Sequence, residues 1–104
     1  MEGGGTNPEE LIAAAYAGCF SQAFAVVLEE AGYPPERIET SADVTLEKRE
    51  EGFTITTVAL ETRARVQGIN EGKLRELAEG AKNNCPVSRA LTGVQKSVQA
   101  TLMR

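Results

Sequence analysis

The apolar positions of the chain recur with two different periods, and the first segment they define is a long helix. Residues 11–28 are almost all apolar or small and are rich in alanine. Asn7, or Thr6 before it, can cap this segment, and Pro8 fits the first helical position. Glu10 follows Asn7 by three residues, the spacing of a capping box. Gly32 ends the helix, which is apolar enough to be packed on more than one side.

Two strands and a turn are predicted after this helix. Ala42, Val44 and Leu46 alternate with polar residues, which is the period of a half-buried strand. A second apolar run covers residues 53–66, but its apolar positions change from odd to even numbers near Thr56 and Thr57. We therefore expect a β-bulge or bend at that point of the second strand.

The remaining elements are a helix, a short helix and a strand. Asn70 can cap a helix that ends near Asn84, and Pro86 can open a short helix that Gly93 stops. In the last strand, residues 94–102, the alternate positions are apolar except for Lys96. The order helix, strand, strand, helix, short helix, strand predicts a single α+β domain over residues 1–104.

The apolar helix has consequences for assembly and for membrane binding. The eighteen residues 11–28, interrupted only by the polar Ser21 and Gln22, approach the length of a membrane span. The many alanines and the glutamates on both flanks favour a central core helix instead. Three strands supply little surface to cover such a helix. We therefore expect the chain to form an oligomer and to have no membrane partner.

Composition excludes several classes of function. Lys and Arg number 11 and Asp and Glu number 15, so the net charge is −4, and no basic run is present; a nucleic-acid partner is not expected. The sequence contains no histidine, which excludes Ser-His-Asp and Cys-His nucleophiles and His-ligated metals. Two cysteines cannot complete a four-ligand zinc site, and we expect no metal and no cofactor. Without a basic signal segment, a cytoplasmic location is expected.

Cys19 and Cys85 are the residues with the clearest chemical potential. In a reducing compartment two thiols are either small core residues or a redox pair. Cys19 lies inside the apolar helix, and Glu9 precedes it by ten residues, about 15 Å along an unbroken helix. Cys85 precedes Pro86 at the start of a helix, where backbone N–H groups favour a thiolate. On these grounds Cys85 is predicted to be the more acidic thiol.

Two sequence segments resemble the signatures of a known family. GTNPEELIAAAYAGCFS, residues 5–21, is similar to the first-cysteine signature of the OsmC/Ohr family, and CPVSRAL, residues 85–91, resembles the second. The order and separation of the segments also resemble that family, across the whole chain. The Cys-Pro-Val-Ser sequence looks closer to the osmotically inducible branch than to the organic hydroperoxide resistance branch.

The resemblance implies a fold, an activity and three site residues. It implies a central helix packed on an antiparallel sheet, and an intertwined homodimer with active sites at the subunit interface. It also implies a thiol-dependent peroxidase acting on organic or inorganic hydroperoxides. By motif, Cys19 corresponds to the peroxidatic thiol, Cys85 to the resolving thiol and Glu9 to the active-site carboxylate. An external thiol would reduce the resulting disulfide.

The sequence departs from the family pattern at its N-terminus. Family members carry an N-terminal β segment with an active-site arginine, whereas this chain starts four residues before Gly5 and its first arginine is Arg37. Arg89, one turn after Cys85, is a candidate for the missing positive charge. Three explanations stay open: a fragment or mis-started enzyme, a shortened homologue, or a fold that has lost the activity. The alternative function is accordingly a non-catalytic dimer, a binding or remnant protein or a redox sensor.

Overall fold

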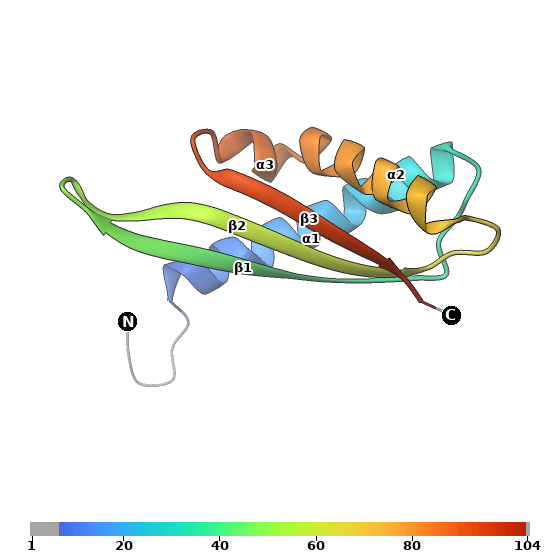
Figure 1. The fold of residues 1–104 in the computed structure, drawn as a ribbon, viewed down its shortest axis with the longest axis horizontal. Helices are drawn as coiled ribbons and strands as arrows, with labels where there is room; N and C mark the ends of the chain where they lie inside the picture. The colour runs from blue at the N-terminus through green and yellow to red at the C-terminus, as the bar shows by residue number, and fades with distance from the viewer. Residues whose placement is uncertain (1–6, 104) are drawn as a thin grey trace.

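The computed structural model describes residues 7–103 and has the α+β architecture that the sequence predicts. Thr6, the alternative helix cap, and the glycine-rich lead at residues 1–5 lie outside the described residues. Figure 1 shows the path of the chain. In chain order the elements are α1 (Pro8–Glu30), β1 (Arg37–Arg49), β2 (Gly52–Arg65), α2 (Glu71–Asn84), α3 (Pro86–Ala90) and β3 (Gln95–Leu102).

Helix α1 begins at the predicted cap and buries one stripe of large side chains. The Glu10 N–H donates to the Asn7 side chain at 2.8 Å, and the Glu10 carboxylate accepts from the Asn7 N–H at 3.4 Å. This reciprocal pair is a capping box. Tyr16, Phe20, Phe24 and Leu28 recur every four residues and are all fully buried. The stripe therefore faces the core along the length of the helix.

The sheet is mixed rather than antiparallel, which corrects one expectation. Its strand order is β1-β2-β3; β1 pairs antiparallel to β2, but β3 pairs parallel to β2. The cause is the connection between them. Helices α2 and α3 carry the chain back along the sheet, so β3 starts at the same end as β2. A crossover of this kind places the two strands in parallel, whereas a short turn joins β1 to β2.

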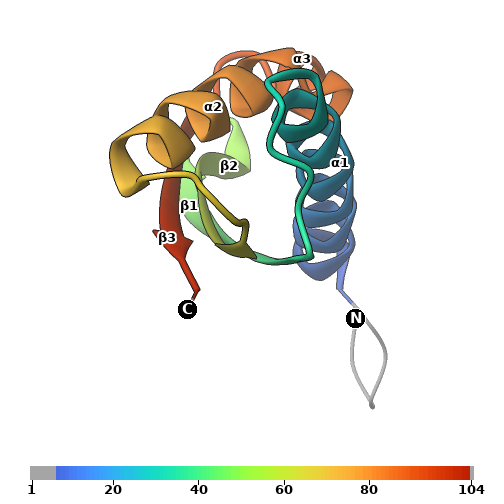
Figure 2. The ribbon, with the colours of Figure 1, turned by 90° about the vertical axis from the view of Figure 1, so that its right-hand side faces the viewer.

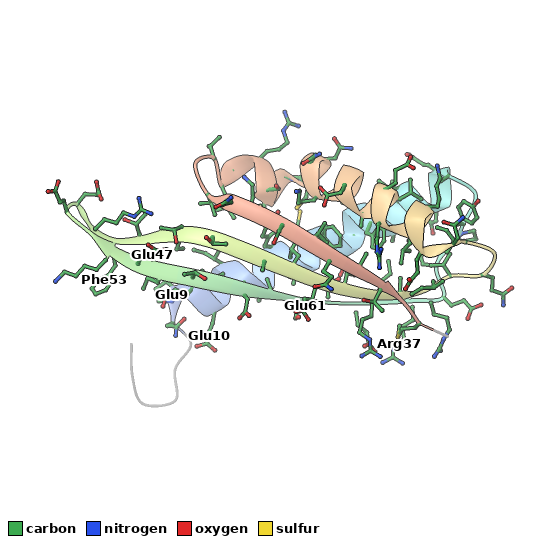
Figure 3. All side chains as sticks on the ribbon, in the orientation of Figure 1. Glu9, Glu10, Arg37, Glu47, Phe53 and Glu61 are labelled. Carbon is green, nitrogen blue, oxygen red and sulfur yellow. The ribbon has the colours of Figure 1, made fainter. Side chains whose placement is uncertain are left out.

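The predicted bulge is confirmed at Thr56. Thr45 pairs with Thr57, and the next residue of β1, Leu46, pairs with Ile55, which leaves Thr56 as the extra residue of β2. Beyond this point the β1–β2 hairpin extends past the helices (Figure 1) and its side chains are largely exposed. Phe53, 72% exposed, lies near its tip (Figure 3).

Helices α1 and α2 cover the same face of the sheet, and the core lies between them and the strands (Figure 2). Helix α1 packs on β1, while α2 packs on β3 and on α1. A chain of hydroxyls crosses this layer: Ser21 donates to Thr40 at 2.8 Å, and Thr40 lies 2.9 Å from Thr62. These bonds explain why the apolar helix tolerates Ser21 at a position that faces the sheet.

Helix α1 is also long and apolar enough to cross a membrane, judged by length and composition alone. A core helix of a soluble protein meets the same criterion. Only 22% of its most apolar 18-residue window is buried here, and Leu11 and Val26 are more than half exposed. Much of the apolar surface of α1 is therefore uncovered in the single chain.

Candidate active site

The fold brings the two cysteines together although 66 positions separate them. Both are free, Cys19 half-buried on α1 and Cys85 fully buried. The Cys85 thiol donates to the Cys19 sulfur, and the two sulfur atoms are 2.9 Å apart. A disulfide bond is about 2.05 Å long, so the thiols lie side by side in the reduced state and need little movement to be joined.

Cys85 is positioned by the backbone at the junction of α2 and α3. Its N–H donates to the Ala81 carbonyl at 3.0 Å, and its own carbonyl accepts from the Arg89 N–H at 3.1 Å. Its backbone is extended, with φ −67° and ψ 127°, because Pro86 disfavours helical geometry in the preceding residue. The junction turns the Cys85 side chain inward, toward α1.

The expectation that the helix start lowers the pKa of Cys85 is wrong in its direction. Burial raises the pKa of Cys85, and the hydrogen bond to Cys19 raises it further. The backbone N–H groups of Ser88 and Val87 act the other way and lower it. The net effect is a rise, because the cost of burying a thiolate outweighs the stabilisation that these two N–H groups supply.

The raised pKa values predict a loss of stability at alkaline pH. Burial also raises the pKa of Tyr16, so the folded state holds both groups neutral more strongly than the unfolded chain does. Their contribution to the free energy of unfolding is complete below the ordinary thiol pKa of about 8.5 and is lost as pH rises through the raised folded value. We expect the melting temperature of the reduced protein to fall above about pH 8.5. Cys85→Ala should reduce the fall in melting temperature with pH. An unchanged pH dependence in this variant would contradict this account.

Lys96 holds the helix that follows Cys85. Its ammonium group donates to the Ser88 carbonyl at 3.0 Å and to the Leu91 carbonyl at 2.8 Å, at the C-terminal end of α3. A positive charge at this end of a helix also complements the dipole. The one charged residue on the apolar side of β3 is thus a cap for α3, and the parity exception in the sequence has a structural reason.

Replacing Lys96 with methionine should destabilise the protein without creating a cavity. The change orphans two part-buried carbonyl groups, and hydrogen bonds to charged groups contribute about 1.5–3 kcal/mol. Urea unfolding monitored by circular dichroism measures the loss. The matched control is Lys48→Met on the exposed end of β1, for which we expect a change within about 0.5 kcal/mol. Equal losses in both variants would rule out the capping role.

The structure does not bring Glu9 to its own Cys19. Helix α1 is unbroken from Pro8 to Glu30, so the ten intervening residues place the two side chains about 15 Å apart along the axis. Glu9 lies in the first turn of α1 near β1 (Figure 3). It lines a shallow groove of about 280 Å³ together with Ala42 and Val44 of β1. Arg89, the candidate for the missing charge, is exposed on α3.

Two further residues belong to this site and carry only a weak sequence signal. Tyr16 precedes Cys19 by one helical turn and is fully buried, and Ser88 of α3 is 5% exposed. The helical spacing of Tyr16 and Cys19 could have placed both on one face of α1. For Ser88 the only signal is its position within the first turn after Cys85.

Comparison with protein families and curated proteins gives a consistent result. The family described as OsmC-like protein matches residues 1–99. Peroxiredoxin OsmC of Escherichia coli K12 is 49% identical over 87 residues, covering 84% of this chain and 61% of that protein. The organic hydroperoxide resistance protein of Xanthomonas axonopodis pv. citri is 36% identical over 92 residues, covering 88% and 63%. The chain thus spans less than two thirds of these relatives.

Solved structures show the same likeness at the level of the fold. An organic hydroperoxide resistance protein OsmC from Legionella pneumophila superposes with a TM-score of 0.80 at 34% identity, covering 99% of this chain and 73% of that one. For OhrB of Bacillus subtilis the TM-score is 0.78 at 35% identity, with 97% and 73% covered.

Proposed function

Because the chain belongs to the OsmC-like protein family, we propose that it is a thiol-dependent peroxidase that reduces organic or inorganic hydroperoxides in defence against oxidative stress. The observation that carries the proposal is the pair of free sulfur atoms 2.9 Å apart, from residues 66 positions apart. Relatives named peroxiredoxin and organic hydroperoxide resistance protein support the same chemistry.

The proposed reaction uses only the two cysteines, a hydroperoxide and an external thiol. The Cys19 thiolate attacks one oxygen of the hydroperoxide, the O–O bond breaks, and an alcohol or water leaves with a proton. Cys19 becomes a sulfenic acid. Cys85 loses its proton and attacks the Cys19 sulfur, the S–O bond breaks, and water leaves as the disulfide forms. An external thiol then reduces the disulfide by exchange.

A homodimer would complete this site, and two features of the chain support it. The apolar surface of α1 that the single chain leaves uncovered includes Leu11 and Val26, 58% and 51% exposed. Exposed apolar surface of this kind is typical of an interface. Glu9 lies too far along an unbroken helix to reach its own Cys19. A carboxylate in that position acts on a thiol only if it belongs to a second copy of the chain.

One observation favours the second candidate, a non-catalytic dimer of the same fold. Two lysines on elements near the thiols, Lys82 of α2 and Lys96 of β3, are engaged elsewhere, and Arg89 is exposed on α3. The Lys96 ammonium group binds two carbonyls, and the Lys82 ammonium group lies 2.9 Å from a carboxylate oxygen of Glu79. A reactive cysteine needs a positive neighbour to favour its thiolate. Without one, Cys19 would react with peroxide like any free thiol.

The rate of thiol oxidation distinguishes the two candidates. The reduced protein is mixed with an organic hydroperoxide, and the remaining free thiols are counted over time. We expect both thiols to disappear together as an intramolecular disulfide forms, much faster than in the same chain unfolded in urea. The unfolded chain is the matched control because it has the same thiols and no site. Equal rates in the two states would establish the non-catalytic alternative.

A further inference from the structure

The hydroxyl group of Tyr16 is a buried donor that the folded chain leaves unused. The Tyr16 side chain is fully buried, and its oxygen forms no hydrogen bond with any atom of the described residues. Burying a hydroxyl without a partner costs free energy, so an orphaned group of this kind calls for an explanation. Phenylalanine would fill the same space without that cost.

The surroundings of the hydroxyl indicate which atoms it serves. Tyr16 lies one turn before Cys19, on the helix that packs against both α2 and α3. Burial raises the pKa of Tyr16 most, and negative charge on Cys85, on Cys19 and on Glu79 would raise it further. Ser88 is close enough to lower the pKa of Tyr16, although the geometry falls short of a hydrogen bond. The phenol oxygen thus lies among the residues that carry the two thiols.

We propose that the Tyr16 hydroxyl is a hydrogen-bond donor held for the Cys85 sulfur, and that it acts when Cys85 becomes a thiolate to close the disulfide. This inference rests on the proposed peroxidase function and assigns a residue to its second step. In the reduced state Cys85 is a neutral thiol that donates to Cys19. A neutral thiol is a weak acceptor, so the hydroxyl has no good partner then.

A hydrogen-bond donor is needed because disulfide formation creates a negative charge on a buried sulfur atom. Before it attacks the sulfenic acid of Cys19, Cys85 must lose its proton, and its sulfur is fully buried. A buried anion is costly unless a hydrogen bond meets it. The Tyr16 hydroxyl supplies that bond and keeps its own proton throughout. The Cys85 sulfur then forms the S–S bond, the S–O bond breaks, and the departing hydroxide combines with the released proton as water.

Other charged and polar groups near Tyr16 and Cys85 already have partners, so Tyr16 is the donor available to a Cys85 thiolate. Glu79 of α2 acts on the phenol as a negative charge but is paired with Lys82. Lys96 of β3 is bound to the carbonyls of Ser88 and Leu91. On the sheet side, the Thr40 hydroxyl bonds to both Ser21 and Thr62, so these three hydroxyls already have partners.

The test compares Tyr16→Phe with Tyr33→Phe, a half-buried tyrosine outside this cluster. Each change is made in the chain that also carries Cys19→Ser, so that Cys85 is the one remaining thiol. The ionisation of Cys85 is followed as a function of pH by the NMR chemical shift of its Cβ atom. We expect Tyr16→Phe to move the midpoint upward by about one pH unit, a tenfold smaller thiolate fraction at a given pH, and Tyr33→Phe to leave it unchanged. An unmoved midpoint with Tyr16→Phe overturns the proposal.

Two further measurements separate this role from a structural one and from the proposed function itself. With both cysteines present, Tyr16→Phe should slow disulfide formation about tenfold while sulfenic acid forms at the rate of the parent protein. Its melting temperature should be equal or higher, because an orphaned hydroxyl has been removed. A lower melting temperature with normal disulfide formation shows a structural role and overturns the inference. The pH titration of Cys85 contains no peroxide, so its result stands even if the parent protein proves not to be a peroxidase.

Discussion

Replacing Cys19 with serine is expected to abolish all peroxide-dependent oxidation above the rate of the unfolded chain. A serine hydroxyl is far less acidic and less nucleophilic than a thiol, so the first S–O bond cannot form. Cys85 remains in this variant, but it is fully buried and its pKa is raised by burial. Stopped-flow mixing of the reduced variant with an organic hydroperoxide, followed by a count of free thiols, measures the loss.

The variant Cys85→Ser is the matched comparison, because it removes the other sulfur of the same pair. It should still consume one equivalent of hydroperoxide per chain and then stop, with Cys19 held as a sulfenic acid that mass spectrometry detects as one added oxygen atom. If Cys19→Ser kept rapid oxidation and Cys85→Ser lost it, the two roles would be reversed. If both variants matched the parent protein, neither cysteine would be the site.

The second large effect concerns the core beneath the site. Phe24 is fully buried, and its ring centroid lies 5.3 Å from that of Phe20 at an angle of 39°. Phe24→Ala leaves a cavity under α1 and should lower the free energy of unfolding by about 3–5 kcal/mol. That is a large share of the roughly 5–15 kcal/mol that stabilises a typical domain. Urea titration with a folding-sensitive probe measures the change.

Phe53→Ala is the control for this effect, since it deletes the same ring at the tip of the β1–β2 hairpin, where the side chain is 72% exposed (Figure 3). We expect a change within about 0.5 kcal/mol. A cost for Phe24→Ala below about 1 kcal/mol would mean that the α1 stripe is not packed as described.

Local pattern predicted most of the fold. The caps at Asn7 and Asn70, the short helix after Pro86 and the bulge at Thr56 all follow from neighbouring residues, and each is present. The direction of β3 did not follow, because the pairing of β3 with β2 depends on how α2 and α3 lead the chain back across the sheet. Alternation along a strand shows which face is buried, but it is the same in parallel and antiparallel pairs.

The sequence predicts which residues form the site, but it does not predict their burial or their hydrogen-bond partners. The two signatures nominate Cys19 and Cys85, and the fold places their sulfurs side by side. The direction of the Cys85 pKa was missed because sequence reveals the helix start after Cys85 but not the burial that outweighs it. The orphaned hydroxyl of Tyr16 was invisible for the same reason. Lys96 was visible in the sequence as a charged residue at a strand position where the alternation predicts an apolar one.

The long separation of the two cysteines along the chain couples oxidation to folding. A bond between residues 66 positions apart would close most of the chain into one covalent ring, and the lost freedom of the unfolded ensemble corresponds to about 4 kcal/mol. By thermodynamic linkage, the fold favours the disulfide by the same amount that the disulfide favours the fold. In each turnover the protein would therefore alternate between a more stable oxidised state and a less stable reduced state. Resistance to proteolysis would then report how much of the protein is oxidised at a given moment.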